Sequence, residues 1–152
     1  MKLLLVCLLS MIGCAHGAVT LTLDSGGTVS FAFVDADYDI NGVAQKTVAS
    51  GSRLTIDKSG GAGYTFHARA LTSTFSLTPD RVGDNYAKPC GGLGVKVSTS
   101  GTYVPLTTSD QLLASASANR TVYNIDYRLN SNLSLEVPGT YTLTVVFTVT
   151  QP

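Results

Sequence analysis

The acidic stretch DADYDING, residues 35–42, carries the side chains best suited to holding a metal ion. Asp37, Asp39 and Asn41 alternate before a glycine, as in the first half of a calcium loop, where oxygen ligands surround a tight turn. The twelfth position of such a loop would be Val48 in place of the bidentate glutamate. Two interpretations follow: a weak calcium site, or a strand with solvated carboxylates that ends in an Asn-Gly turn. The calcium interpretation uses as ligands Asp35, Asp37, Asp39 and Asn41.

Two other side chains are reactive by type. Cys90 lies in the sequence Lys-Pro-Cys-Gly-Gly, which predicts either an exposed thiol for an intermolecular disulfide or an unreactive, partly buried one. His67 is the only histidine after residue 17, and it falls on the polar face of an alternating segment, as a surface histidine does. No general base, nucleophile or metal set can be named. We therefore predict that the protein is not an enzyme and has no cofactor, apart from the calcium ion considered above.

The end of the chain shows the clearest structural pattern. In TYTLTVVFTVT, residues 140–150, apolar side chains alternate with threonines, and only Val146 interrupts the alternation. This pattern predicts a half-buried β-strand whose apolar row packs against a second sheet. The row consists of Tyr141, Leu143, Val145, Phe147 and Val149.

Similar short segments recur along the chain, separated by Gly, Pro, Asn, Asp and Ser. Val19, Leu21 and Leu23 form the first of them, and SDQLLASASANR, residues 109–120, is the only candidate for a short helix. This spacing predicts an all-β fold, a single antiparallel immunoglobulin-like (Greek-key) sandwich of about eight to ten strands.

The first seventeen residues have the features of a secretory signal peptide: Lys2, an apolar run, and small residues before Ala18. We expect residues 1–17 to be removed and residues 18–152 to form one domain. The apolar run is too short to span a bilayer, and no transmembrane segment is recognised after it. In an alternative interpretation, Met11-Ile12-Gly13-Cys14 resembles a bacterial lipobox, which would place a lipid on Cys14.

Composition narrows the choice of partners. Charged residues make up 13% of the chain, with ten basic and ten acidic side chains. Such a balance offers no basic surface for nucleic acid. Cys90 would be the one thiol after cleavage, so packing rather than an internal disulfide must stabilise the domain.

The segments YNIDYRL and PGTYTLTVVFTVT, mainly residues 121–150, resemble the terminus of bacterial surface β-sandwiches of the pilin and WxL-like kind. Resemblance to chaperone-usher pilins implies an immunoglobulin-like domain that lacks one strand, which the N-terminal extension of the next subunit completes. Here Val19, Leu21 and Leu23 would supply such an extension; alternatively, they form the first strand of a closed sandwich. The residues expected to pair strands are these three and the apolar row at residues 141–149.

These observations favour an exported structural or adhesive subunit of the cell surface, which assembles by strand pairing in the manner of a pilin. Its partners would be other surface subunits or a second copy, and its location the periplasm, the cell surface or the medium. The alternative function is a monomeric secreted ligand-binding module, with calcium-assisted binding of carbohydrate.

Overall fold

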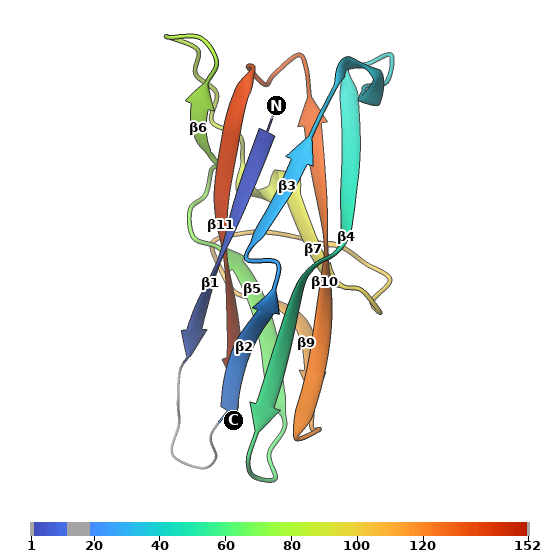
Figure 1. The fold of residues 1–152 in the computed structure, drawn as a ribbon, viewed down its shortest axis with the longest axis vertical. Helices are drawn as coiled ribbons and strands as arrows, with labels where there is room; N and C mark the ends of the chain where they lie inside the picture. Colours follow the sequence, from blue (N-terminus) through green and yellow to red (C-terminus); the bar gives the residue numbers. More distant parts are fainter. Residues whose placement is uncertain (1, 12–18, 152) are drawn as a thin grey trace.

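The computed structural model describes residues 2–11 and 19–151. It is an all-β sandwich of two sheets, which confirms the predicted fold class (Figure 1). Helical structure in the described residues is limited to two 3-10 turns, η1 (Asp35–Asp37) and η2 (Cys90–Gly92). No helix in the described part of the chain is long and apolar enough to cross a membrane.

The first sheet contains the two ends of the described chain. Five of its strands lie in the order β3-β1-β11-β5-β9, and β6 pairs with a further stretch of β11. The strands are β3 (Thr28–Ala32), β1 (Lys2–Met11), β11 (Gly139–Thr150), β5 (Tyr64–Ala70), β9 (Gln111–Ala116) and β6 (Ser76–Pro79).

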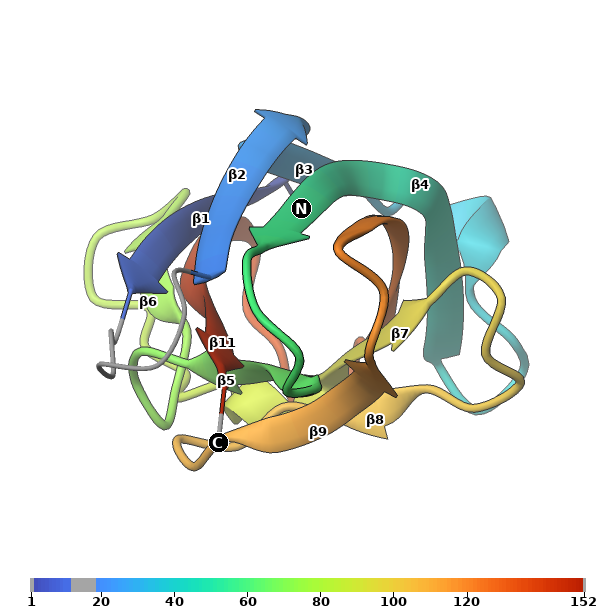
Figure 2. The same ribbon diagram turned by 90° about the horizontal axis from the view of Figure 1, so that it is seen from below.

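The second sheet has the order β2-β4-β10-β7-β8, with all neighbours antiparallel. Seen from the end in Figure 2, the two sheets curve around a shared interior. The strands are β2 (Val19–Ser25), β4 (Val43–Lys58), β10 (Arg120–Asn132), β7 (Leu93–Val97) and β8 (Val104–Pro105).

The interior is filled by alternate residues of each strand, as the period of a half-buried strand requires. All five residues of the apolar row on β11 expose at most 1% of their surface, which confirms the prediction that this row faces a second sheet. Aromatic rings join the sheets, because the ring of Phe66 stacks on Tyr123 at 5.1 Å and on Phe147 at 5.6 Å.

A polar contact fixes a break in the pairing of β4 with β10. The register between these strands shifts between Ile125 and Tyr127. At this point the Asp126 carboxylate accepts hydrogen bonds from the Ser50 amide, at 2.8 Å, and from the Ser98 hydroxyl. Ser50 has a φ of 49°, a left-handed conformation that costs energy for a non-glycine residue, and the bond to Asp126 offsets part of that cost.

The structure differs from two local alternatives that the sequence left open. The segment considered as a short helix contains the edge strand β9, because its backbone pairs with β5 from Ala116 to Gln111 and the sheet overrides weak helical propensity. The acidic stretch does not form a strand: residues 35–37 make the turn η1, and β4 begins only at Val43.

Candidate strand-pairing site

The segment predicted to be a signal peptide is an inner strand of the first sheet. β1 pairs in parallel with β11 at ten positions, from Lys2 opposite Thr140 to Met11 opposite Val149. It pairs antiparallel with β3 at five positions, from Lys2 opposite Ala32 to Val6 opposite Thr28. Figure 1 shows β1 between these two neighbours. We call the space between β3 and β11 that β1 occupies the slot.

The walls of the slot are apolar on the side of the core. β11 contributes its apolar row, and β3 contributes Val29 and Phe31, which expose 3% and 2% of their surface. The register sets Leu3 of β1 opposite both Tyr141 and Phe31. Alternate residues of a strand lie on one face of the sheet, so any strand in the slot places every second residue in the row of these core side chains.

The opposite face of the slot is more polar. Here β11 carries Thr140, Thr142 and Thr144, each partly buried. A strand seated in the slot therefore lies beside threonines on one face, with Val146 the one apolar residue among them, and beside core residues on the other. Such a site favours an occupant in which apolar and polar residues alternate.

Over most of the length of β11, only the edge that faces the slot could pair with another strand. On the other edge its backbone pairs with β6 at residues 139–142 and with β5 at residues 145–150. If β1 were absent, residues 140–149 of β11 would present unpaired N–H and C=O groups, and so would residues 28–32 of β3. Open edges of this kind are templates for pairing with another chain.

The directions of β3 and β11 determine which ladders a strand in the slot can form. β1 is parallel to β11 and antiparallel to β3, so β3 and β11 run in opposite directions. Any strand between them must form one parallel and one antiparallel ladder, whichever way it enters. The ladder with β11 is the longer of the two, with ten paired positions against five with β3.

The first predicted pairing segment belongs to its own domain in this structure. β2 pairs with β4 from Val19 opposite Lys58 to Ser25 opposite Arg53. Leu21 is 1% exposed, whereas Val19 and Leu23 are partly buried against the core. Val19, Leu21 and Leu23 therefore form an edge strand of the second sheet, and they could enter another copy only by leaving β4.

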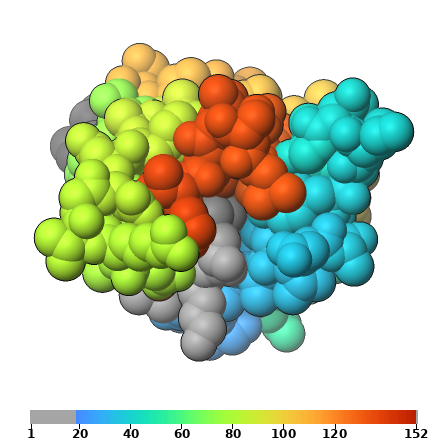
Figure 3. Space-filling view, turned by 90° about the horizontal axis from the view of Figure 1, so that it is seen from above, coloured from blue at the N-terminus to red at the C-terminus, as the bar shows by residue number. Residues whose placement is uncertain are grey.

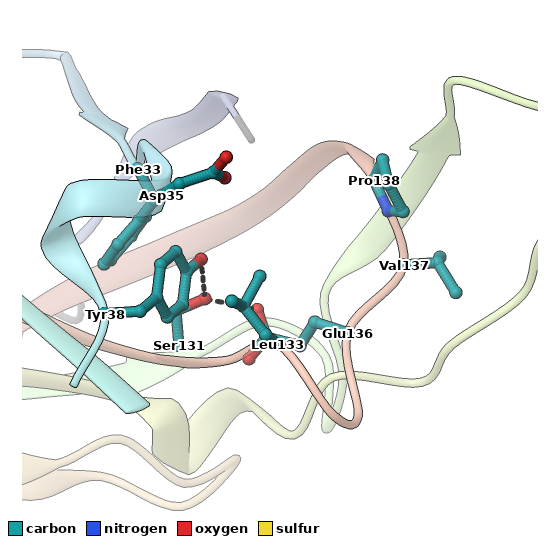
Figure 4. A pocket seen from close by; sticks show the side chains of 8 residues that line it. All are labelled: Phe33, Asp35, Tyr38, Ser131, Leu133, Glu136, Val137 and Pro138. Carbon is teal, nitrogen blue, oxygen red and sulfur yellow. Dashed lines mark hydrogen bonds between the residues drawn. The ribbon is translucent and has the colours of Figure 1, made fainter. Parts of the chain in front are cut away.

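A pocket of about 200 Å³ lies at the end of the slot where β1 begins. Figure 3 looks onto this end of the sandwich, where the orange-red segment 132–138 lies between the cyan segment 33–43 and the lime segment 71–88. The side chains that line the pocket, drawn in Figure 4, are Phe33, Asp35, Tyr38, Ser131, Leu133, Glu136, Val137 and Pro138.

A buried ion pair between Lys88 and Glu136 lies next to the pocket, and Glu136 is one of the residues that line it. The Lys88 ammonium contacts the Glu136 carboxylate, with side chains 3% and 7% exposed, and also donates to the carbonyl of Asn130 at 2.7 Å. Burial lowers the pKa of Lys88, although Glu136 favours its charged form. The second Glu136 oxygen accepts from the Ser131 hydroxyl at 2.9 Å, and that hydroxyl lies 2.9 Å from the hydroxyl of Tyr38.

The predicted calcium ligands have other partners. Asp37 pairs with the Lys46 ammonium at 2.6 Å, and this contact lowers the pKa of its carboxyl group. Asp39 accepts from the amides of Asn41 and Val43, both at 2.9 Å, so it holds the turn before β4. Within residues 2–11 and 19–151, no group of three or more His, Cys, Asp or Glu side chains is placed to hold a metal ion. The set of Asp35, Asp37, Asp39 and Asn41 is thus not assembled as a metal site.

The other reactive residues lie apart from the slot. Cys90 is 7% exposed, its thiol lies 3.4 Å from the carbonyl of Leu106, and burial raises its pKa, which matches the unreactive interpretation. His67 is half-buried on β5 rather than fully at the surface, and its Nδ1 has no hydrogen-bond partner among the described residues. Cys14, the alternative lipidation site, lies outside the described residues.

The alternating patterns at residues 19–23 and 141–149 predicted the strands β2 and β11. They did not predict that residues 2–11 pair between β3 and β11. The signal that pointed to it was the apolar run at residues 3–12, which was assigned to export alone. No protein-family model matches the chain, and no curated protein matches its sequence.

Proposed function

We propose that the protein is an exported subunit of the bacterial surface, structural or adhesive, whose sandwich is completed by a strand from a neighbouring subunit. The observation that carries this proposal is the position of β1. Residues 2–11 pair with ten residues of β11 inside the sheet, yet their sequence is that of a cleavable signal peptide. Removing them opens the slot.

An open slot would not remain empty in a stable protein. The apolar walls formed by Val29, Phe31 and the row on β11 would meet water, at a cost of about 25 cal/mol per Å² exposed. The backbone edges of β3 and β11 would also lose their partners over residues 28–32 and 140–149. Both costs are recovered when another chain adds a strand, which is a common mode of protein association.

The position of β2 favours a neighbour with its own pairing segment over exchange of Val19, Leu21 and Leu23 between copies. β2 already contributes Leu21 to the core and forms a ladder with β4. If Val19, Leu21 and Leu23 paired with another copy, β2 would lose its hydrogen bonds to β4 and gain only a replacement ladder. A neighbouring subunit that carries an alternating segment outside its own sandwich could pair with β3 and β11 without breaking any of its own strand pairing.

The test uses the exported protein and the domain spanning residues 18–152. Mass spectrometry of the exported form should give an N-terminus at Ala18, and native gels should show a ladder of complexes that boiling collapses. The isolated domain should bind a synthetic ten-residue peptide with leucine at alternate positions and threonine between them, which we call the slot peptide. A peptide of the same composition with leucines and threonines in two blocks is the matched control.

Two results would overturn the proposal. One is an exported protein that retains residues 2–11, because its slot would be permanently closed. The other is a strictly monomeric domain that binds neither the slot peptide nor a surface subunit.

A further inference from the structure

A second pocket, of about 280 Å³, shares Ser131 and Glu136 with the first but is otherwise formed by different residues. Its lining comes from the start of β4, the end of β10 and two connecting segments, residues 86–92 and 135–136. In the described chain, β1 pairs with β3 and β11 and with none of these segments. The second pocket is therefore a site apart from the slot and its occupant.

A buried ion pair with one unused donor borders this pocket. The Lys88 ammonium carries three N–H groups. It contacts the Glu136 carboxylate and donates to the carbonyl of Asn130 at 2.7 Å, and no third acceptor is found among the described residues. A Cβ added to Gly92 would lie 3.6 Å from Cε and 3.9 Å from Nζ of Lys88. Because Gly92 also lines the pocket, the ammonium group borders its open space.

Two asparagines at the pocket also have unused donors, whereas their side-chain oxygens are engaged. Oδ1 of Asn130 accepts from the side-chain amide of Gln45 at 2.8 Å. Oδ1 of Asn132 accepts from the backbone amide and the hydroxyl of Ser134, at 2.9 and 2.6 Å. For the side-chain nitrogens of Asn130 and Asn132, no acceptor is found in the part of the chain that the structure describes. A ligand that pairs with these groups must supply acceptors.

The lining is neutral and partly apolar. Lys88 and Glu136 are the only charged side chains among the described residues that line it, and they neutralise each other. A charged ligand would add an uncompensated charge beside a pair whose side chains are 3% and 7% exposed. Val43, Pro89 and Leu135 supply apolar surface. The pocket therefore suits a neutral molecule with a hydrogen-bond acceptor and a small apolar group.

We propose that this pocket binds the acetamido group of a neutral N-acetylated amino sugar. The acetamido carbonyl is a neutral acceptor for the free N–H of Lys88, and the methyl group next to it suits the apolar lining. Hydroxyl groups of the sugar would accept from the side-chain nitrogens of Asn130 and Asn132, and the ring would pack against Tyr86. A cavity of about 150 Å³ holds benzene, so a volume of about 280 Å³ is sufficient for this group and part of the ring. The site would give an adhesive subunit a carbohydrate ligand, and it does not depend on strand pairing.

The test is an NMR titration of the isotope-labelled full chain, in which β1 fills the slot. The probe is N-acetylglucosamine, for which the ligand efficiency of drug-sized molecules predicts a dissociation constant of about 1 mM. Glucose lacks the acetamido group, glucosamine has an ammonium group in its place, and Nε-acetyllysine has the acetamido group without a sugar ring. Each of these three should bind at least about tenfold more weakly. The amide signals of Gly92, Asn130 and Asn132 should shift most.

Gly92 allows the pocket to be filled without breaking the ion pair. The atom nearest to an added Cβ is Cε of Lys88 at 3.6 Å, an ordinary contact, so Gly92→Ala and Gly92→Leu should fold. Gly101→Leu is the matched control, because a Cβ there meets no atom within 4 Å and Gly101 does not line the pocket. We expect Gly92→Leu to weaken binding of N-acetylglucosamine at least about tenfold, Gly92→Ala about threefold, and Gly101→Leu less than about twofold.

Three results would overturn the site. One is the absence of any spectral change with N-acetylglucosamine at about twenty times the expected dissociation constant. Another is binding of glucose or Nε-acetyllysine as tight as that of N-acetylglucosamine. The third is unchanged affinity in Gly92→Leu; denaturant unfolding shows whether this variant folds, and unchanged affinity in Gly92→Ala decides if it does not. The strand-acceptor function is tested separately, by the slot peptide and the domain of residues 18–152, so either proposal can fail alone.

Discussion

Removing residues 1–17 should destabilise the sandwich by a large fraction of its total stability. β1 forms ten paired positions with β11 and five with β3. At about 0.5 kcal/mol net for the hydrogen bonding at each position, the low end of the usual range, the two ladders contribute roughly 7 kcal/mol. Domains of this size are stable by about 5–15 kcal/mol in total. We therefore expect the domain of residues 18–152 to be marginally folded on its own.

The assay is guanidinium unfolding at pH 7, followed by far-UV circular dichroism, of the full chain and of the domain without residues 1–17. The midpoint of the shorter protein should lie far below that of the full chain. Its m-value should also fall, because less surface is buried without β1. The slot peptide, present at about one hundred times its dissociation constant, should restore about 2.7 kcal/mol.

The reasoning is refuted if the two proteins unfold at the same denaturant concentration. That result would mean that β1 adds nothing to the sandwich and that β3 and β11 tolerate open edges. Equal stabilisation by the slot peptide and by the block-sequence control would refute the claim that alternation is what the slot recognises.

Four further results are expected. Lys88→Met should cost about 3–5 kcal/mol because it leaves Glu136 buried without a partner, while the double variant Lys88→Met/Glu136→Leu should be nearly as stable as wild type in denaturant unfolding. Leu21→Ala should cost about 2–4 kcal/mol in the same assay if β2 stays in its own sheet, since Leu21 is 1% exposed; no loss would place β2 outside the domain. Burial opposes ionisation of Asp126, but hydrogen bonds from Ser50 and Ser98 and the charge of Lys96 hold its pKa below the usual value, so the advantage of wild type over Asp126→Asn should be full above about pH 4 and should shrink as the pH falls through the folded-state pKa. Cys90 should react with a maleimide far more slowly in the native protein than in denaturant, because burial raises the pKa of its thiol; equal rates would contradict its burial.

The sequence predicted those elements whose pattern directly reflects burial. The apolar row on β11 could be assigned to the core because strict alternation has few explanations other than a half-buried strand. The same rule identified β2 by Val19, Leu21 and Leu23. It did not identify the first half of β4, where polar residues cover the exposed face and only Ala44 is buried before Gly51.

The sequence was least informative where contacts outside the segment itself decide the local conformation. In β9 the run Leu112-Leu113-Ala114 suits a helix by propensity, but pairing with β5 makes it a strand. The acidic stretch matched a calcium loop only by residue type. Lys46, which follows on strand β4, pairs with Asp37, and the amide of Val43 donates to Asp39, so these two carboxylates hold the turn before β4.

The fit of β1 to its neighbours also explains why the slot should suit another strand better. A signal peptide is apolar on both faces, because export selects for overall hydrophobicity rather than alternation. By register, Leu4 and Val6 of β1 lie opposite Thr142 and Thr144, and only Leu8 meets an apolar residue in that row, Val146. A segment with threonine or serine at these positions would match the polar face of β11 and keep its apolar residues for the core. If residues 1–17 are removed as we propose, we therefore expect an alternating strand to match β11 better than residues 2–11 do.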